Sequence, residues 1–225
     1  MASISTDQKN RKVSKKINYL AIAGMALVVM SAIFLLYNFF PAMLVELRYD
    51  LSPKKNFTVE TRAAEENPVA ESKTGDSNII VPVDEQFGII IPKIFVNSKV
   101  FPDVDPENSA VYQRILTKGV AHVLGTAHPG ESGNVFIFAH SGQDFFQAER
   151  YNAVFYLLTK LEKGDEITIF YKGDKFIYSV SDKKVINANE VSYLNNIPGK
   201  NTLTLMTCWP AGTAWKRLIV QAEQN

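Results

Sequence analysis

The residues most able to do chemistry lie in the last quarter of the chain. Cys208 is the only cysteine among the 225 residues, and Arg217 follows it nine positions later. The apolar, alternating run 202–207 ends at Cys208 and the run 216–223 begins beside Arg217, which is typical of two antiparallel strands. We therefore expect the thiol and the guanidinium at one rim of the sheet.

A lone cysteine in an arbitrary chain is more often a small buried hydrophobe than a nucleophile. Cys208 differs because it stands at a strand end, where functional groups are often displayed. A nearby cation also favours the thiolate and can hold the oxyanion that forms when a thiolate attacks a carbonyl. We predict that Cys208 is a nucleophile and that Arg217 assists it.

Three histidines could supply a general acid/base. His140 ends the apolar run 134–139, again a strand-end position, and we predict it to be the acid/base. We expect His122 and His128 to be polar groups satisfied near loops. No CxxC pair or HExxH spacing occurs, so the sequence predicts no metal site. There is also no GxSxG elbow for a serine nucleophile.

The letters around these residues resemble a known family. "TLMTC" (204–208) resembles the TLxTC signature of the sortases, the membrane-anchored cysteine transpeptidases of bacterial cell surfaces. "KGVAHVLGTAHPGESGNVFIFAH", "IPKI", "LEKGDEI" and "KRLIV" are similar to other blocks of that family and keep their order. The resemblance covers roughly residue 79 to the end. "FAHSG" departs from the pattern on both sides of His140, which leaves the subclass open.

The resemblance implies a fold, a reaction and a site. The family fold is an eight-stranded β-barrel, in agreement with the many short strand-like runs between residues 79 and 223. Cys208 would be the nucleophile, His140 the acid/base and Arg217 the clamp for substrate and oxyanion, with Thr207 assisting as a substrate-binding residue. Substrates would be proteins with an LPxTG-like sorting signal, and the acceptor an amine of a peptidoglycan precursor or a pilin. No metal or organic cofactor is implied.

Two other functions fit the same residues less well. A membrane-tethered cysteine peptidase would use the same three side chains with water as acceptor, and the sequence does not separate it from a transpeptidase. A non-catalytic barrel would predict a damaged triad, whereas all three members are present. Trp209 and Trp215 either brace the loop after Cys208 or line a peptide groove. We favour bracing and keep Trp209 as a candidate substrate-binding residue.

A second signal precedes the catalytic domain. Residues 17–40 contain no charge and are long enough to cross a bilayer as a helix. Five basic residues and one acid come before them, whereas charges of both signs follow, so the positive-inside rule puts residues 1–16 in the cytoplasm and the rest outside. A cleavable signal peptide has a shorter apolar region. A buried globular helix is disfavoured because only Asn18, Ser31, Tyr37 and Asn38 interrupt the apolar run, mostly near its ends.

The remaining organisation follows from composition. Residues 41–78 read as a juxtamembrane segment and flexible stalk, in which 42–49 could extend the membrane helix or lie at the interface. Residues 79–225 would form the extracellular catalytic domain. Helices are expected near 109–117 and 148–161, and a hairpin turn at 172–174. The net charge of +1 gives no nucleic-acid signature.

Overall fold

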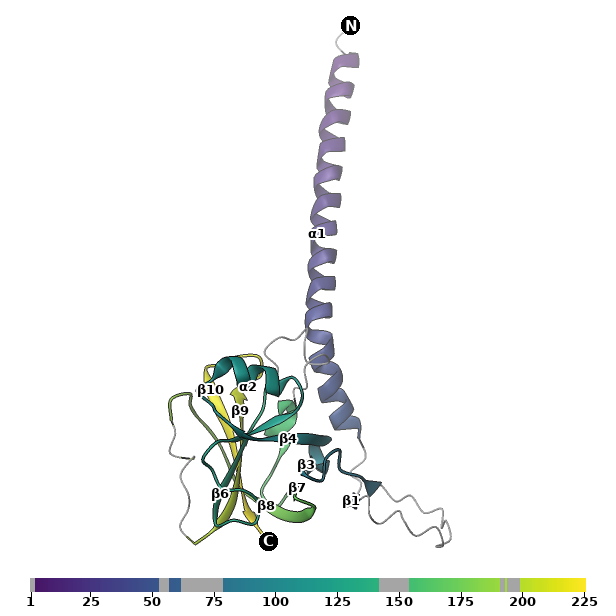
Figure 1. Ribbon diagram of the computed structural model, residues 1–225. Helices are drawn as coiled ribbons and strands as arrows, with labels where there is room; N and C mark the ends of the chain where they lie inside the picture. Colours follow the sequence, from purple (N-terminus) through teal and green to yellow (C-terminus); the bar gives the residue numbers. More distant parts are fainter. Residues whose placement is uncertain (1–2, 53–56, 62–78, 142–153, 191–192, 194–198) are drawn as a thin grey trace, which may run out of the picture. The chain divides into compact units, whose positions relative to one another are not determined.

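The computed structural model describes the chain except for residues 1–2, 53–56, 62–78, 142–153, 191–192 and 194–198 (Figure 1). Two compact units follow each other along the sequence, Met1–Leu47 and Arg48–Asn225. Each unit has its own architecture, a long helix in the first and a barrel in the second.

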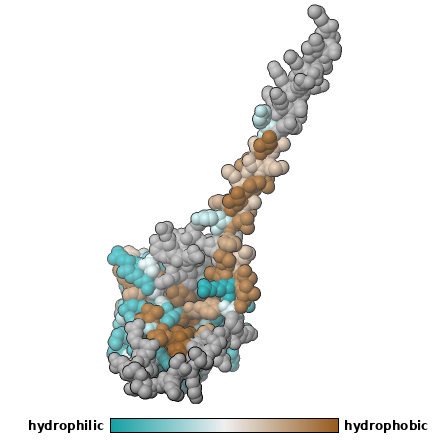
Figure 2. All heavy atoms as spheres, turned by 90° about the vertical axis from the view of Figure 1, so that its right-hand side faces the viewer, coloured by the Kyte–Doolittle hydropathy of each residue, from teal (hydrophilic) through white to brown (hydrophobic). Residues whose placement is uncertain are grey.

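The first unit is dominated by the helix α1, Ser3–Leu51. Its segment Tyr19–Tyr37 has a mean hydropathy of 2.4 with none of it buried, and apolar side chains cover this part of the helix in Figure 2. The segment lies within the predicted span 17–40 and is one candidate membrane anchor. Residues 42–49 continue the helix.

The second unit is an eight-stranded closed β-barrel, which confirms the predicted fold. Its strands follow the order β10-β8-β7-β3-β4-β5-β6-β9 around the barrel. Their bounds are β3 Phe87–Ile91, β4 Val96–Val104, β5 Val120–Val123, β6 Gly133–Phe138, β7 Glu166–Tyr171, β8 Asp174–Asn187, β9 Asn201–Trp209 and β10 Lys216–Gln224.

Local sequence explains most of these elements. Val, Ile and Phe fill β3 and β6, and every residue of both strands is buried, which is typical of strands covered on both faces. β7 and β8 are joined by Lys172 and Gly173, with φ of 54° and 90°. Two positive φ values in a two-residue loop match the right-handed twist of the strands, so the predicted hairpin is confirmed.

One short α-helix, α2 (Ser109–Leu116), covers part of the barrel. It begins after Asn108, whose side-chain oxygen accepts a hydrogen bond from the Val111 backbone N–H (3.2 Å). Leu116 is buried in a core cluster with residues of β5 and β6. The helix predicted near 109–117 is therefore present, and it packs on the strands that lead to the candidate site.

Other predictions differ from the structure. The helix expected over 148–161 is, within the described residues, the 3₁₀ helix η3 (Tyr156–Lys160), and the part before 154 lies outside them. Its apolar residues Leu157 and Leu158 are buried, so their helical spacing reflects the packing of a short 3₁₀ turn. A further 3₁₀ helix, η2 (Pro92–Ile94), separates β3 from β4. The run 79–83 forms only a two-residue strand, β2 (Ile79–Ile80).

A short strand pair also lies beside the barrel. β2 pairs in parallel with β1, Thr58–Val59, which belongs to the predicted stalk. Val59 is buried with Ile90 and Phe170 of the barrel. The stalk prediction was based on polar composition and did not include this contact, while residues 62–78 lie outside the described part of the chain.

Candidate active site

The hairpin of β9 and β10 positions the thiol and the guanidinium. The strands are antiparallel, and Arg217 is directly opposite Cys208 in their register. Opposite residues in such a pair project to the same face with Cβ atoms about 4.5–5.5 Å apart. The register places Cys208 and Arg217 next to the turn that joins the two strands, which agrees with the expected position of both at one rim of the sheet.

The strand β6 brings the histidine to the same edge. β6 runs parallel to β9, with Phe138 opposite Met206, and the Ala139 N–H then donates to the Met206 carbonyl (3.2 Å). His140 and Cys208 each lie two residues beyond this last registered pair. Both line a cavity of about 290 Å³, and so does Arg217.

Thr207 joins the two strand ends from inside. Its side chain is 3% exposed, and its hydroxyl donates to the Ala139 carbonyl at 2.9 Å. The bond links the residue before Cys208 to the residue before His140. Thr207 contacts the cavity, but its hydroxyl is directed to the backbone of β6, so its geometry is that of a group that holds the two strand ends together.

The cavity has a second wall that the sequence did not predict. Tyr112 and Gln113 of α2 line it together with Tyr193. Tyr193 is 7% exposed and stacks on Phe136, with ring centroids 5.8 Å apart. The helical pattern of 109–117 placed α2 but not its docking site, and no sequence motif marks Tyr193.

Two features set the electrostatics of the site, the burial of His140 and the charge of Arg217. Burial lowers the pKa of His140, because the imidazolium would lose hydration. Among the described residues no carboxylate forms an ion pair with Arg217, whose Nη1 donates instead to the carbonyls of Ala214 and Lys216, both at 3.1 Å. Backbone carbonyls fix the guanidinium without cancelling its charge, so the charge remains available to an anion in the cavity.

The tryptophans lie outside the cavity lining. Trp209 is half-buried opposite Lys216 and is not among the described residues that line the cavity, so its predicted role in substrate binding is without support from this geometry. Trp215 is 78% exposed. Such exposure leaves Trp215 little to pack against, which argues against the favoured interpretation that it braces the loop.

The other two histidines belong to a different cluster. His122 on β5 and His128 in the following loop have ring centroids 4.7 Å apart, and both approach Asp103 of β4. Neither is among the described residues that line the cavity beside Cys208. Of the three histidines, His140 alone meets the thiol in one cavity, as the strand-end argument predicts.

Comparison with known proteins agrees with this geometry. The chain matches the family model of the sortase domain over residues 89–225. The chain belongs to the sortase family. It is also similar to sortase D of Bacillus subtilis (strain 168), with 26% identity over 137 residues, which are 60% of this chain and 61% of that protein. The chain thus spans somewhat less than two thirds of the length of this curated relative.

Solved sortase structures share the barrel. Sortase C-1 from Actinomyces oris is 31% identical with a TM-score of 0.54, and the match covers 64% of this sortase and 76% of that chain. A Clostridium perfringens sortase D5 transpeptidase is 30% identical with a TM-score of 0.51, covering 63% and 79%. Relatives of types C and D match about equally well, so the subclass stays open.

Proposed function

We propose that this sortase is a cysteine transpeptidase that cuts an LPxTG-like sorting signal and joins the new carboxyl end to an amine. The observation that carries the proposal is the meeting of Cys208, His140 and Arg217 in one cavity, with Arg217 directly opposite Cys208 across β9 and β10. A nucleophile, a proton carrier and a fixed cation are the three groups that thiol-mediated acyl transfer needs.

In the first half-reaction His140 takes the proton of the Cys208 thiol, and the resulting thiolate attacks the carbonyl carbon of the signal's threonine. The carbonyl π electrons move to oxygen, and the guanidinium of Arg217 stabilises the resulting oxyanion. The oxyanion collapses, the C–N bond breaks, and His140 as imidazolium gives its proton to the leaving amine. The products are a thioester on Cys208, a free amine and neutral His140.

In the second half-reaction an incoming amine attacks the thioester carbon. Neutral His140 removes a proton from this amine, the C–S bond breaks, and the imidazolium gives the proton to the leaving thiolate, which restores the Cys208 thiol and neutral His140. The acceptor we propose is the amine of a peptidoglycan precursor or a pilin lysine. Neither half-reaction uses a metal or an organic cofactor.

The competing acceptor is water, which would make the protein a membrane-tethered peptidase. The test incubates the full chain in detergent with an LPxTG-containing peptide, with and without an excess of a peptidyl amine, and quantifies both products by mass spectrometry. We expect cleavage to give the amide when amine is present, with Cys208→Ala inactive in both conditions. Hydrolysis that no amine diverts would identify a peptidase, and no cleavage of any sorting peptide would reject the function.

We also propose that α1 anchors the enzyme in the cell membrane with the N-terminus in the cytoplasm and the barrel outside. The proposed orientation is based on the excess of basic residues before the apolar segment Tyr19–Tyr37. Protease added to intact protoplasts should remove the barrel and spare the first residues. Protection of the barrel in intact cells, with digestion only after lysis, would refute this orientation.

A further inference from the structure

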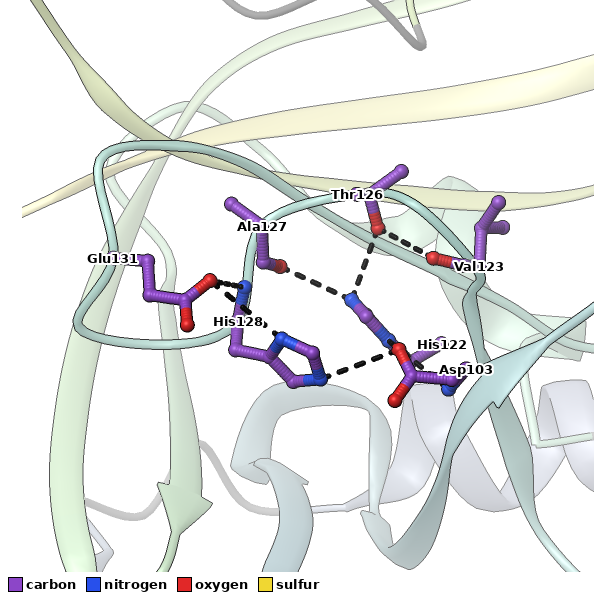
Figure 3. A network of polar contacts seen from close by, with 7 residues as sticks. All are labelled: Asp103, His122, Val123, Thr126, Ala127, His128 and Glu131. Atoms are coloured by element: carbon purple, nitrogen blue, oxygen red, sulfur yellow. Dashed lines mark hydrogen bonds and ion pairs between the residues drawn. The ribbon is translucent and has the colours of Figure 1, made fainter.

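Asp103, His122 and His128 bring three potential metal ligands together (Figure 3). None of the three is among the described residues that line the cavity beside Cys208. Asp103 Oδ1 lies 3.4 Å from His122 Nδ1 and 3.3 Å from His128 Nε2. The three ligand atoms all lie within 4.8 Å of one another. Zinc–ligand bonds of about 2.0–2.1 Å put neighbouring ligand atoms of a tetrahedral site about 3.3–3.4 Å apart. Two of the three separations already have this value.

The hydrogen bonds of His122 fix which of its nitrogens has a free electron pair. Nε2 lies 3.0 Å from the Ala127 carbonyl and 2.9 Å from the Thr126 hydroxyl, which itself donates to the Val123 carbonyl (2.8 Å). Both neighbours accept, so the proton is on Nε2 and the lone pair is on Nδ1, which points to Asp103. His122 is fully buried.

His128 lies between two carboxylates. Its Nε2 approaches Asp103, and its Nδ1 lies 3.6 Å from Oε2 of Glu131, which also accepts from the His128 backbone N–H (2.9 Å). A neutral imidazole carries one proton, so one carboxylate would face a lone pair. A cation at the Asp103 side removes this conflict, because the ring can then donate through Nδ1 to Glu131. Such an outer carboxylate is a common partner of a metal-bound histidine.

The backbone and the aromatic neighbours set the orientation of these groups. Asp103 lies where the β4–β5 register shifts, with a φ of 52°, and an irregularity of this kind re-aims a side chain. The ring of His128 stacks on Tyr171, and that of His122 packs against Phe87. Asp103 and His128 are partly exposed, so an ion can enter from solvent.

We propose that Asp103, His122 and His128 bind a divalent transition metal of the zinc type, with water as the fourth ligand. Imidazole and carboxylate ligands suit zinc, and a fourth position left open is common where the protein supplies three ligands. The ion would replace the long hydrogen bond from the Asp103 N–H to His122 Nδ1 (3.3 Å). It would join β4, β5 and the loop that leads into β6. Motif spacing could not predict it, because Asp103 and His122 are 19 residues apart on different strands.

The test uses the full chain without a histidine tag, in detergent, stripped with a chelator. The background is Cys208→Ala, because the thiolate could otherwise take zinc beside His140. We expect titration with zinc to show one bound ion per chain. The melting temperature should rise by about 5 to 10 °C when zinc is at about 100 times its dissociation constant. Cobalt should give the visible spectrum of a four-coordinate nitrogen and oxygen site without a sulfur charge-transfer band.

Two variants remove ligands with little other change. Asp103→Asn suits the positive φ, which Asn also tolerates, and His128→Phe retains a ring against Tyr171. Each should lower zinc affinity at least tenfold, whereas Asp105→Asn, an exposed neighbour in the same segment, should not. Circular dichroism of the metal-free variants verifies folding. Absence of binding in the Cys208→Ala background, or binding unchanged in both ligand variants, would overturn the site.

Discussion

Arg217→Ala is the substitution with the most defined consequence. The guanidinium lies opposite Cys208 and, within the described residues, pairs with no carboxylate, so its full charge is available to an oxyanion formed at the cavity. Loss of one such donor elsewhere lowers turnover by about 10²- to 10³-fold, or roughly 2.7–4 kcal/mol of transition-state stabilisation. We expect a loss of this size in kcat/KM for a sorting peptide.

The same substitution should affect stability much less. The structure assigns the Arg217 side chain two hydrogen bonds to backbone carbonyls at exposed positions, each worth about 0.5–1.5 kcal/mol or less. The melting temperature should therefore fall by only a few degrees, since about 1 kcal/mol corresponds to roughly 2–4 °C in a domain of this size. Arg217→Lys should restore activity only in part, because lysine lacks the planar fork of donors.

The assay is cleavage of a fluorogenic sorting peptide, measured with a matched control next to Arg217 in the chain. Lys216 precedes it in β10, is exposed, and projects to the other face of the strand, so Lys216→Ala removes one positive charge without changing the cavity. It should retain near-normal turnover. A folded Arg217→Ala variant with near-normal turnover, or an equal loss in Lys216→Ala, would refute the assignment of Arg217 to the oxyanion.

Three further predictions concern the strand ends. Thr207→Val keeps the shape of the side chain but leaves the buried Ala139 carbonyl without its donor. This should lower the free energy of unfolding by about 1–3 kcal/mol and reduce turnover as well. An unchanged melting temperature would contradict the role of this hydrogen bond. His140→Ala should abolish both cleavage and transfer, because the leaving amine then has no proton donor, and detectable amide product would contradict this. Burial holds the folded-state pKa of His140 below its unfolded value near 6.5, so the unfolded chain takes up the proton first as the pH falls. The free energy of unfolding should therefore decrease as the pH drops from 6.5 towards the folded-state pKa. Melting curves from pH 7 to 5 should show a weaker pH dependence for His140→Gln.

The sequence predicted the barrel because each strand has a local apolar pattern that can be recognised in the sequence. Alternating or continuous apolar runs, broken by turn residues such as Lys172 and Gly173, indicate strands without knowledge of their partners. The strand β5 was not predicted as such, since four residues that include a buried histidine give little periodicity. Residues 148–161 showed helical spacing, and the part that the structure describes is a single 3₁₀ turn.

Some residues of the candidate site could likewise be predicted from the sequence, and others could not. Cys208, Arg217 and His140 could be predicted because each marks a strand end, and strand ends can be read from the sequence. Tyr193 and the α2 face of the cavity could not, because they depend on packing between segments distant in the chain. The cluster of Asp103 with two histidines depends on a register shift between β4 and β5, and spacing rules do not contain that information.

We propose that Cys208 carries the acyl group between donor and acceptor. The most direct measurement is the intact mass of the full chain, quenched in acid within the first turnovers after addition of an LPxTG-containing peptide and no amine. We predict an added mass equal to the peptide up to its threonine, located on Cys208 by fragmentation and removed by an added amine with formation of the amide. A chain that cleaves the peptide with no adduct on Cys208, or an adduct that an amine cannot discharge, would exclude Cys208 as the acyl carrier.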